Sequence, residues 1–320
     1  MASTSQSARQ STSAAAIQAG AAIAAGALIC VALAFAAGAR GDGAYGMTGE
    51  AGAEFIDTST SSPRDDALAM LQARPSAPGV SAETAPAGRL AVIIDDIGFD
   101  GAALDRLLAL DVPLTLSVLP YAADAPGAAR RISAAGQEVF LHLPMEPSGL
   151  EDPGPYALTK DLGAEAMQAR VLWALSRTPG ARGVNNHMGS RLTTDSGAVQ
   201  RALTPLAGEG LVFVDSLTAP RSVAARTAIG LGIEAAQRDV FLDHEREPAA
   251  IQARLDEALM LAAQHGRAIA IGHPYRETLQ VLETLGARAD AAGVELVFAS
   301  DIVRAGESAG EGAITLIASP

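Results

Sequence analysis

Residues 90–100, LAVIIDDIGFD, decide the fold, because an unbroken apolar run here delivers two adjacent carboxylates. An apolar run of this length is typical of a buried strand in a parallel sheet. Asp95 and Asp96 are then expected at the carboxyl end of the strand, where α/β proteins bind ligands. Adjacent carboxylates in such a place need a cation or a shared proton, and we favour a divalent metal. The alternative is that Asp96 caps the following helix and Asp95 is solvated.

Downstream of this strand, short β-type runs alternate with helical patterns, which indicates βα units and a parallel sheet. Strands are expected at residues 91–94, 114–119, 138–142, 183–186, 211–215, 240–243, 268–272 and 295–298, and helices at residues 102–110, 165–176, 250–265 and 276–291. The fold class is therefore α/β, with a barrel of seven or eight parallel strands as the expected architecture. Periodicity leaves a doubly wound open sheet as the alternative.

Composition divides the chain into an N-terminal signal or anchor segment (1–40), a flexible linker (41–87), an α/β domain (88–305) and a tail (306–320). Residues 19–39 carry no charge and are long enough to cross a bilayer. Small residues at positions 34–36 would also permit cleavage by signal peptidase, so an anchor and a cleaved signal both remain open. Either possibility predicts an exported domain, in the periplasm or on the outer face of the inner membrane. The inner membrane is an expected partner only if the segment is not cleaved.

The charge and cysteine content exclude several kinds of site. A formal net charge of -13 opposes binding to nucleic acid or to anionic membrane surfaces. The one cysteine, Cys30, lies in the apolar N-terminal run, so disulfides and cysteine-based zinc sites are excluded from the folded domain. Any metal must therefore be bound by histidine and carboxylate side chains.

Most of the predicted strands end in a polar side chain suited to catalysis. These residues are Asp95, Asp96, His142, Asn185, Asn186, His187, Asp215, Ser216, Asp243, His244 and His273. They include four of the five histidines in the chain, and the fifth, His265, is expected as a charge at a helix C-terminus. A single histidine is more often structural than functional, but a shared sheet edge strengthens the functional interpretation.

The order VIIDDIG, HLPMEP, NNHMGS, VDS and GHPY, within residues 90–300, resembles the divergent polysaccharide deacetylase family, a distant branch of the NodB-like deacetylases. The resemblance implies a distorted (β/α) barrel over the domain at 88–305. It also implies a divalent metal, usually zinc, and activity on N- or O-acetylated sugars of the cell envelope, so that an acetylated glycan is the expected partner.

The chemistry of the residues agrees with this resemblance. Zinc held by one carboxylate and two imidazoles keeps a position open for a water that loses a proton near neutral pH and attacks an acetyl carbonyl. Asp96, His142 and His187 are the expected ligands. In the deacetylases that the sequence resembles, the first Asp of the pair is the general base, which assigns that role to Asp95. His273 is then the expected general acid.

The sequence also departs from the wider deacetylase pattern. That pattern supplies two histidines on one loop, whereas His142 has no second histidine nearby. Another strand must supply the third ligand, for which His187 is the economical choice and Glu146 or His244 are alternatives. The arginine motif that usually holds the catalytic base is not recognisable, and Arg191 is expected to replace it.

Further residues have supporting roles in this interpretation. Asp215 is expected to orient His273 or His187 by a hydrogen bond. The candidates for substrate contact are Glu146, Asn186, Arg191 and Tyr275. Asn185 and Asn186 either bond sugar hydroxyls or form a turn. Aromatic residues make up only 4% of the chain, which predicts a short or shallow glycan site.

The sequence therefore predicts an exported, metal-dependent carbohydrate deacetylase. Two other functions remain open at this point. One is a non-catalytic envelope protein that binds a glycan or a protein on the same barrel. The other is a glycoside hydrolase that uses Asp95 and Asp215 as paired carboxylates.

Overall fold

A computed structural model describes residue 86 and residues 88–308 of the chain. The predicted N-terminal segment at 1–40, almost all of the predicted linker at 41–87 and residues 309–320 lie outside the described residues. The three boundaries between the four predicted segments therefore stay predictions. Across the part of the chain that is described, no helix is both long and apolar enough to span a bilayer.

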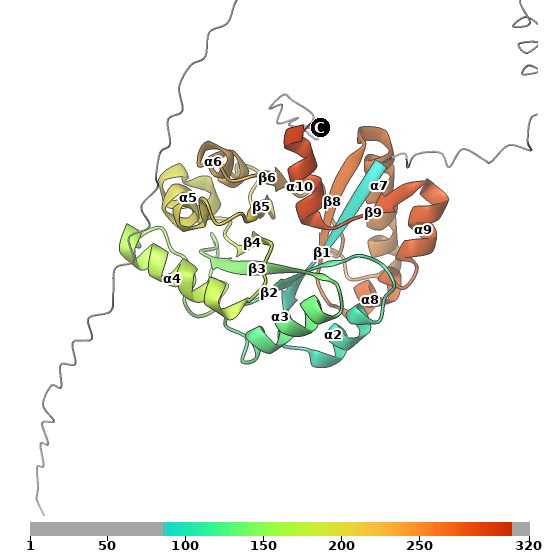
Figure 1. Ribbon diagram of the computed structural model, residues 1–320, viewed down its shortest axis with the longest axis horizontal. Helices are drawn as coiled ribbons and strands as arrows, with labels where there is room; N and C mark the ends of the chain where they lie inside the picture. Colours follow the sequence, from blue (N-terminus) through green and yellow to red (C-terminus); the bar gives the residue numbers. More distant parts are fainter. Residues whose placement is uncertain (1–85, 87, 309–320) are drawn as a thin grey trace, which may run out of the picture. The chain divides into compact units, whose positions relative to one another are not determined.

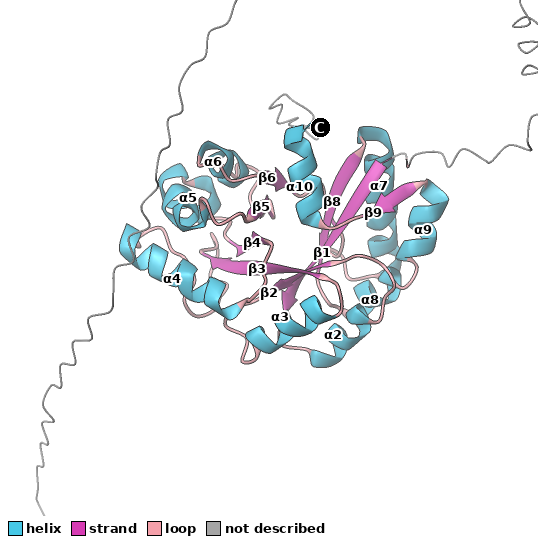
Figure 2. Cartoon of the chain, viewed as in Figure 1, coloured by secondary structure: helices cyan, strands magenta, loops and turns pink. Residues whose placement is uncertain are grey.

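Within residues 88–308, nine parallel strands form one curled sheet (Figures 1 and 2). They are β1 (Gly88–Ile97), β2 (Thr115–Val118), β3 (Glu138–Met145), β4 (Gly183–Met188), β5 (Val212–Asp215), β6 (Ala235–Gln237), β7 (Val240–Phe241), β8 (Arg267–Gly272) and β9 (Val294–Leu296). The order is β6-β5-β4-β3-β2-β1-β8-β7, and β9 also pairs with β1. This is the strand order of a barrel left open between β6 and β7. The prediction of a distorted α/β barrel is confirmed, and a flat doubly wound sheet is not what forms.

Helices follow most of the strands. They are α2 (Gly101–Leu108), α3 (Ala125–Ala134), α4 (Ala164–Arg177), α5 (Ser196–Leu203), α6 (Ala224–Gly230), α7 (Pro248–His265), α8 (Arg276–Leu282), α9 (Leu285–Ala292) and α10 (Ala299–Ser308). The helix predicted at residues 276–291 is in fact two helices, α8 and α9. The Thr284 hydroxyl donates to the Val281 carbonyl at 2.8 Å at the break, where it competes with the helical backbone bonds.

The strands that carry the site are longer than their apolar runs predicted. The expected strand at residues 138–142 extends to Met145, and the one at residues 183–186 extends to Met188. His142 and His187 therefore lie within strands, where backbone pairing fixes their positions. The strand β6 was not expected from the sequence, because it is only three residues long and half-buried.

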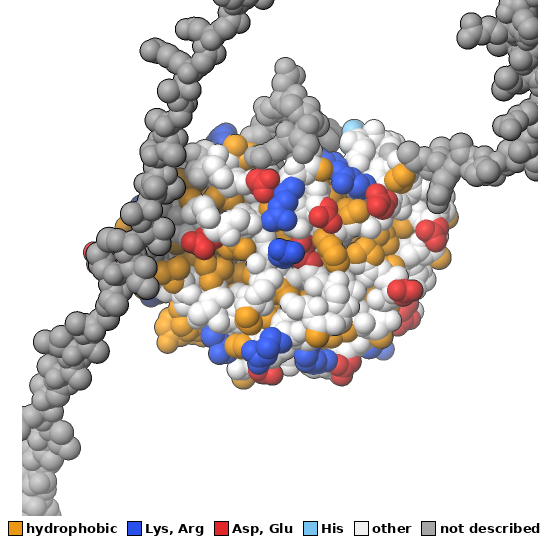
Figure 3. Space-filling model, in the orientation of Figure 1, with side chains coloured by type: hydrophobic (Ala, Val, Ile, Leu, Met, Phe, Trp, Pro, Cys, Tyr) orange, Lys and Arg blue, Asp and Glu red, His pale blue; other side chains and the backbone are white. Residues whose placement is uncertain are grey.

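The alternating pleat of the strands separates two apolar layers. In β1, Leu90, Val92 and Ile94 pack against the outer helices. Ala91 and Ile93 instead face the interior of the curled sheet. In the view of Figure 3, Lys and Arg side chains are interspersed with Asp and Glu over the surface.

The helix α10 lies inside the curve of the sheet, between its two arms (Figure 1). Its Ala299, Ile302 and Val303 side chains join the interior apolar cluster. Its first turn is held at the start of the strands: the Ser300 N–H donates to the Glu138 carboxylate at 3.2 Å. The helix α10 therefore packs at the amino-terminal end of the strands, away from their carboxyl ends.

Candidate metal centre

A bulge in β1 turns both aspartates of the first motif toward the interior. Neighbouring residues of a regular strand face opposite sides of the sheet. Here the pairing of β1 with β2 shifts register between Ile94 and Ile97, and Asp96 has a φ of 57°, a left-handed conformation that Asp tolerates better than most residues. Asp95 Oδ2 and Asp96 Oδ1 consequently lie 3.6 Å and 3.4 Å from His142 Nε2.

The alternative reading of these two aspartates is wrong. The helix α2 is capped by Asp100, whose Oδ1 accepts the backbone N–H groups of Ala102 and Ala103. Asp96 therefore does not cap it. Asp95 has 3% of its surface exposed, so it is not solvated.

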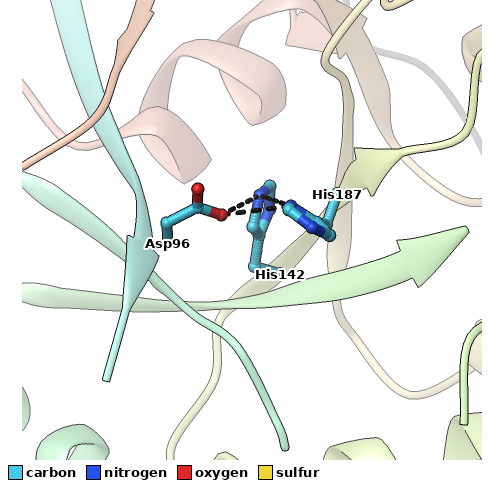
Figure 4. Close-up of side chains that lie close together, drawn as sticks. All are labelled: Asp96, His142 and His187. Atoms are coloured by element: carbon cyan, nitrogen blue, oxygen red, sulfur yellow. Dashed lines mark hydrogen bonds and ion pairs between the residues drawn. The ribbon is translucent and has the colours of Figure 1, made fainter. Parts of the chain in front are cut away.

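Asp96, His142 and His187 converge from β1, β3 and β4 (Figure 4). His187 Nδ1 lies 3.0 Å from Asp96 Oδ1 and 3.2 Å from His142 Nε2. Strand pairing explains the arrangement, since His142 lies opposite Asn185 in the β3–β4 ladder and His187 is two residues farther on the same face. The three candidate ligand atoms all lie within 4.8 Å of one another.

These three residues fit a divalent cation. The buried Asp96 Oδ1 atom has no hydrogen-bond partner among the described residues. His142 Nδ1 lies 2.9 Å from Asn185 Oδ1, which can only accept, so a neutral His142 ring carries its proton on Nδ1 and presents the Nε2 lone pair to Asp96. Converging lone pairs of one carboxylate and two imidazoles are a donor set that suits zinc.

The charges of the cluster are strongly coupled. Burial alone would raise the pKa of Asp96, but the adjacent imidazoles of His142 and His187 outweigh this effect and hold that pKa far below its usual range. Burial alone would lower the pKa of His142, but Asp95 and Asp96 raise it. In this cluster, the two carboxylates therefore favour the positively charged form of the nearby imidazole of His142.

The alternative ligands lie elsewhere. Glu146 Oε1 pairs with Arg191 Nη1 at 2.9 Å, and its Oε2 accepts the Lys160 N–H at 2.9 Å. His244 is exposed and contacts the ring of Phe241. Of the three candidates for the third ligand, the structure brings His187 into the cluster.

Asp95 is a second carboxylate beside the cluster of Asp96, His142 and His187, but it is not one of the three candidate ligands. Its burial raises its pKa, and this effect exceeds the opposing influence of His142, His273 and the Asn185 hydrogen bond. The Asn185 side chain donates to Asp95 Oδ1 at 2.8 Å, while Asp95 Oδ2 faces His142. A buried carboxylate of raised basicity next to a cation position suits a general base.

His273 approaches the other oxygen of Asp96: its Nε2 atom lies 3.8 Å from Asp96 Oδ2, whereas His142 and His187 face Asp96 Oδ1. Asp243 orients the ring: its Oδ1 is 3.0 Å from His273 Nδ1 and its Oδ2 accepts the His273 N–H at 2.5 Å. Burial would lower the pKa of His273, but the Asp243 hydrogen bond and the nearby carboxylates raise it. The His273 Nε2 atom is thus a proton donor that faces the cluster.

The expectation that Asp215 orients His273 or His187 is corrected by this geometry. Val212 and Val214 face the interior, so the next residue, Asp215, falls on the other face of β5. Its oxygens accept from the Leu217 N–H at 2.9 Å and the Ser222 hydroxyl at 2.6 Å, which orders the loop before α6. Asp243 takes the orienting role, because Phe241 pairs with Ile271 and Asp243 therefore lies beside His273.

The other predicted contact residues occupy the rim. Arg191 is paired with Glu146. Asn186 fastens the ends of β4 and β5, because it accepts the Ser216 N–H at 2.9 Å and donates to the Met188 carbonyl at 2.7 Å. Tyr275 stacks on His273 with ring centroids 5.3 Å apart. Its other neighbour is Arg246, whose guanidinium carbon is 3.6 Å from the ring centroid.

The family model for divergent polysaccharide deacetylases matches residues 92–303, which contain every candidate site residue described above. The chain belongs to this family. Divergent polysaccharide deacetylases thus include a member in which the ligand cluster draws one residue from each of three strands.

Two curated relatives and one solved structure are similar to this chain. The chain is 34% identical to the uncharacterized protein YibQ of Escherichia coli over 62% of each chain. It is 33% identical to an uncharacterized protein of Haemophilus influenzae over 61% of this chain and 70% of that one. An uncharacterized protein of Agrobacterium tumefaciens has the same fold, with a TM-score of 0.65 and 23% identity over 70% of this chain and 92% of that one.

Proposed function

We propose that the protein is an exported, metal-dependent hydrolase that removes acetyl groups from a glycan of the cell envelope. In this proposal Asp96, His142 and His187 hold a divalent cation, for which zinc is our choice. Asp95 is the general base and His273 the general acid.

One observation carries the proposal: Asp95 and His273 both border the ligand cluster, with Asp95 Oδ2 3.6 Å from His142 Nε2 and His273 Nε2 3.8 Å from Asp96 Oδ2. Burial raises the pKa of Asp95, so that it is more basic than an ordinary carboxylate. Burial would lower the pKa of His273, but Asp243 and the nearby carboxylates raise it, which favours the protonated ring that can donate a proton. Hydrolysis requires one group that accepts a proton and one that donates a proton, both next to the cation position. Asp95 suits the first role and His273 the second.

The residues divide the reaction between them. A cation in the cluster supplies Lewis acidity toward the acetyl carbonyl and toward water. Asp95 Oδ2 takes a proton from the attacking water as the water oxygen bonds to the acetyl carbon. His273 Nε2 gives a proton to the departing sugar nitrogen or oxygen as the bond from that atom to the acetyl carbon breaks. The products are acetate and the free amine or hydroxyl of the sugar.

The test is acetate release from N-acetylated and O-acetylated envelope glycans by the zinc-loaded full chain. We expect a chelator to abolish release and added zinc to restore it. Asp95→Asn and His273→Asn should each lower kcat by about 10²-fold or more, because each removes one proton transfer. The matched control is His244→Asn, since His244 is an exposed histidine at the same sheet edge that lies outside the cluster.

Other outcomes would support the competing functions. Acetate release that survives Asp95→Asn contradicts the proposed mechanism, and a biological function that survives it indicates a binding protein. Release of reducing ends without acetate would indicate a glycoside hydrolase. The structure gives that reading little support, because the Asp215 carboxylate is fully buried and engaged by its own loop.

Export forms a separate part of the proposal and is supported by the sequence alone. The uncharged run at residues 19–39 is the supporting feature. Fractionation of cells that express the full chain should recover it outside the cytoplasm, either in the inner membrane or in the periplasm. Recovery in the cytoplasm would contradict this part and leave the chemistry of the site unaffected.

A further inference from the structure

We infer that Asn185 is a positioning residue that holds the general base and a metal ligand in one fixed arrangement. This inference rests on the proposed function and deepens it, because it assigns a role to a residue that touches neither the cation nor the substrate. The observation that carries it is the set of four hydrogen bonds around one fully buried amide.

The Asn185 amide uses its whole hydrogen-bonding capacity inside the protein. Its Nδ2 group donates to Asp95 Oδ1 at 2.8 Å and to Ser216 Oγ at 3.2 Å. Its Oδ1 atom accepts from His142 Nδ1 at 2.9 Å and from the Ser117 hydroxyl. An amide has two N–H donors and two acceptor lone pairs, so no capacity is left for a sugar hydroxyl. Asn185 is also 0% exposed.

The chemistry of the partners fixes which way the amide points. The Asp95 carboxylate can only accept, so it needs the Asn185 NH₂ group. His142 must keep its Nε2 lone pair for the cation, so its Nδ1 carries the proton and needs the Asn185 oxygen. Exchanging the two ends of the amide would break both bonds. The base and the ligand are therefore compatible with a single amide orientation.

This arrangement gives asparagine a function that similar side chains cannot supply. Aspartate would still accept from His142, but it would turn a second carboxylate toward Asp95. Leucine has nearly the same shape but can neither donate nor accept. These two substitutions therefore separate the two halves of the proposed role.

The test measures zinc affinity, by competition with a chromophoric chelator, together with kcat and KM for acetate release. Asn185→Leu frees the His142 ring, so zinc affinity should fall by about 10- to 100-fold. Asn185→Asp keeps the acceptor for His142, so zinc affinity should stay close to the wild-type value. Its kcat should nevertheless fall by about 10-fold or more with little change in KM, because Asp95 loses its donor.

The control is Thr218→Val, which removes a hydrogen bond from an exposed hydroxyl to the Met188 carbonyl at the same rim and should change neither quantity. Circular dichroism checks the fold of each variant, and if Asn185→Leu does not fold, the kcat and affinity of Asn185→Asp decide. Wild-type zinc affinity in Asn185→Leu, or wild-type kcat in Asn185→Asp, overturns the role of Asn185. A wild-type protein that binds no zinc overturns the proposed function itself.

Discussion

At the scale of single residues, the site shows how two adjacent aspartates acquire different properties. The imidazoles of His142 and His187 hold the pKa of Asp96 below the usual range, so Asp96 keeps its negative charge. Asp95 is buried with an amide as its donor, and its pKa is raised. Environment rather than residue type separates the two carboxylates, and in the proposed function Asp96 holds the cation while Asp95 takes the proton.

Replacing Asp243 tests the orientation of His273. Asp243→Asn should lower kcat by about 10²-fold while KM changes little, because the ring is no longer held with Nε2 toward the cluster or supported in its charged form. Asp239→Asn is the matched control, since Asp239 also accepts a backbone N–H, that of Ile269 in β8, at 2.7 Å. Steady-state kinetics that show equal losses in both variants would contradict the orienting role.

The sequence was sufficient to nominate Asp96, His142 and His187, because each follows an apolar strand pattern and the structure gathers all three. It predicted Asp215 as the partner of His273, whereas the structure places Asp243 there. That choice depends on which strand lies beside β8, and sheet order is a long-range property that no local pattern records.

At the scale of elements, apolar runs located most strands but not their lengths. The strands β3 and β4 continue through polar residues, because His142, Asn185 and His187 find partners inside the barrel. The split between α8 and α9 was missed for a local reason, namely that an apolar spacing continues across the Thr284 break. Packing and side-chain hydrogen bonds, not periodicity, set these limits.

The contact between Glu138 and the first turn of α10 leads us to expect that stability depends on pH. Glu138 is buried beneath the first turn of α10, and this burial raises its pKa despite hydrogen bonds from Ser300 and Thr115. A raised carboxyl pKa in the folded state means that stability is present at low pH and is lost as pH rises through the folded pKa. The loss should amount to about 1.4 kcal/mol for each unit by which the pKa is raised.

Urea unfolding of wild type and Glu138→Gln between pH 4 and 8 checks this, and wild type should lose stability relative to the variant as pH rises. Glu209→Gln, at an exposed position, should follow wild type throughout. A constant difference between wild type and Glu138→Gln across this range would show that Glu138 does not titrate in the folded protein as inferred.

The barrel interior is tight at Gly183, at the start of β4. A Cβ atom there would overlap the Phe140 ring and lie 2.7 Å from Val212 Cγ2. Gly183→Ala should therefore lower the free energy of unfolding by about 1 to 3 kcal/mol. Gly101→Ala, where a Cβ atom would meet nothing within 4 Å, should leave it unchanged or raise it slightly, as thermal or urea unfolding can show.

At the scale of the whole molecule, the ligand cluster joins strands that are far apart in sequence. A cation held by β1, β3 and β4 binds the folded state and not the unfolded chain, so zinc should stabilise the protein by mass action. At a free zinc concentration of one hundred times Kd the gain is about 2.7 kcal/mol. This corresponds to a rise in Tm of about 5 to 10 °C for a domain of this size.

Differential scanning calorimetry with and without a chelator measures this shift. His142→Ala and His187→Ala should each remove the zinc-dependent part of Tm, whereas His265→Ala, at the C-terminal end of α7, should retain it. A zinc-dependent rise that persists in both ligand variants would place the cation elsewhere.

The position of β1 has a consequence for how the chain is made. This strand pairs with β8 on one side and with β9 and then β2 along the other, and α10 fills the space beneath. During synthesis the first strand to emerge is apolar along most of its length and must wait for partners encoded near the far end of the domain. A ribosome-bound chain that stops before Arg267 carries an exposed strand edge, which is a template for aggregation. The domain therefore completes its fold only after nearly all of it has been translated, and chaperones that hold nascent chains have a defined segment to protect.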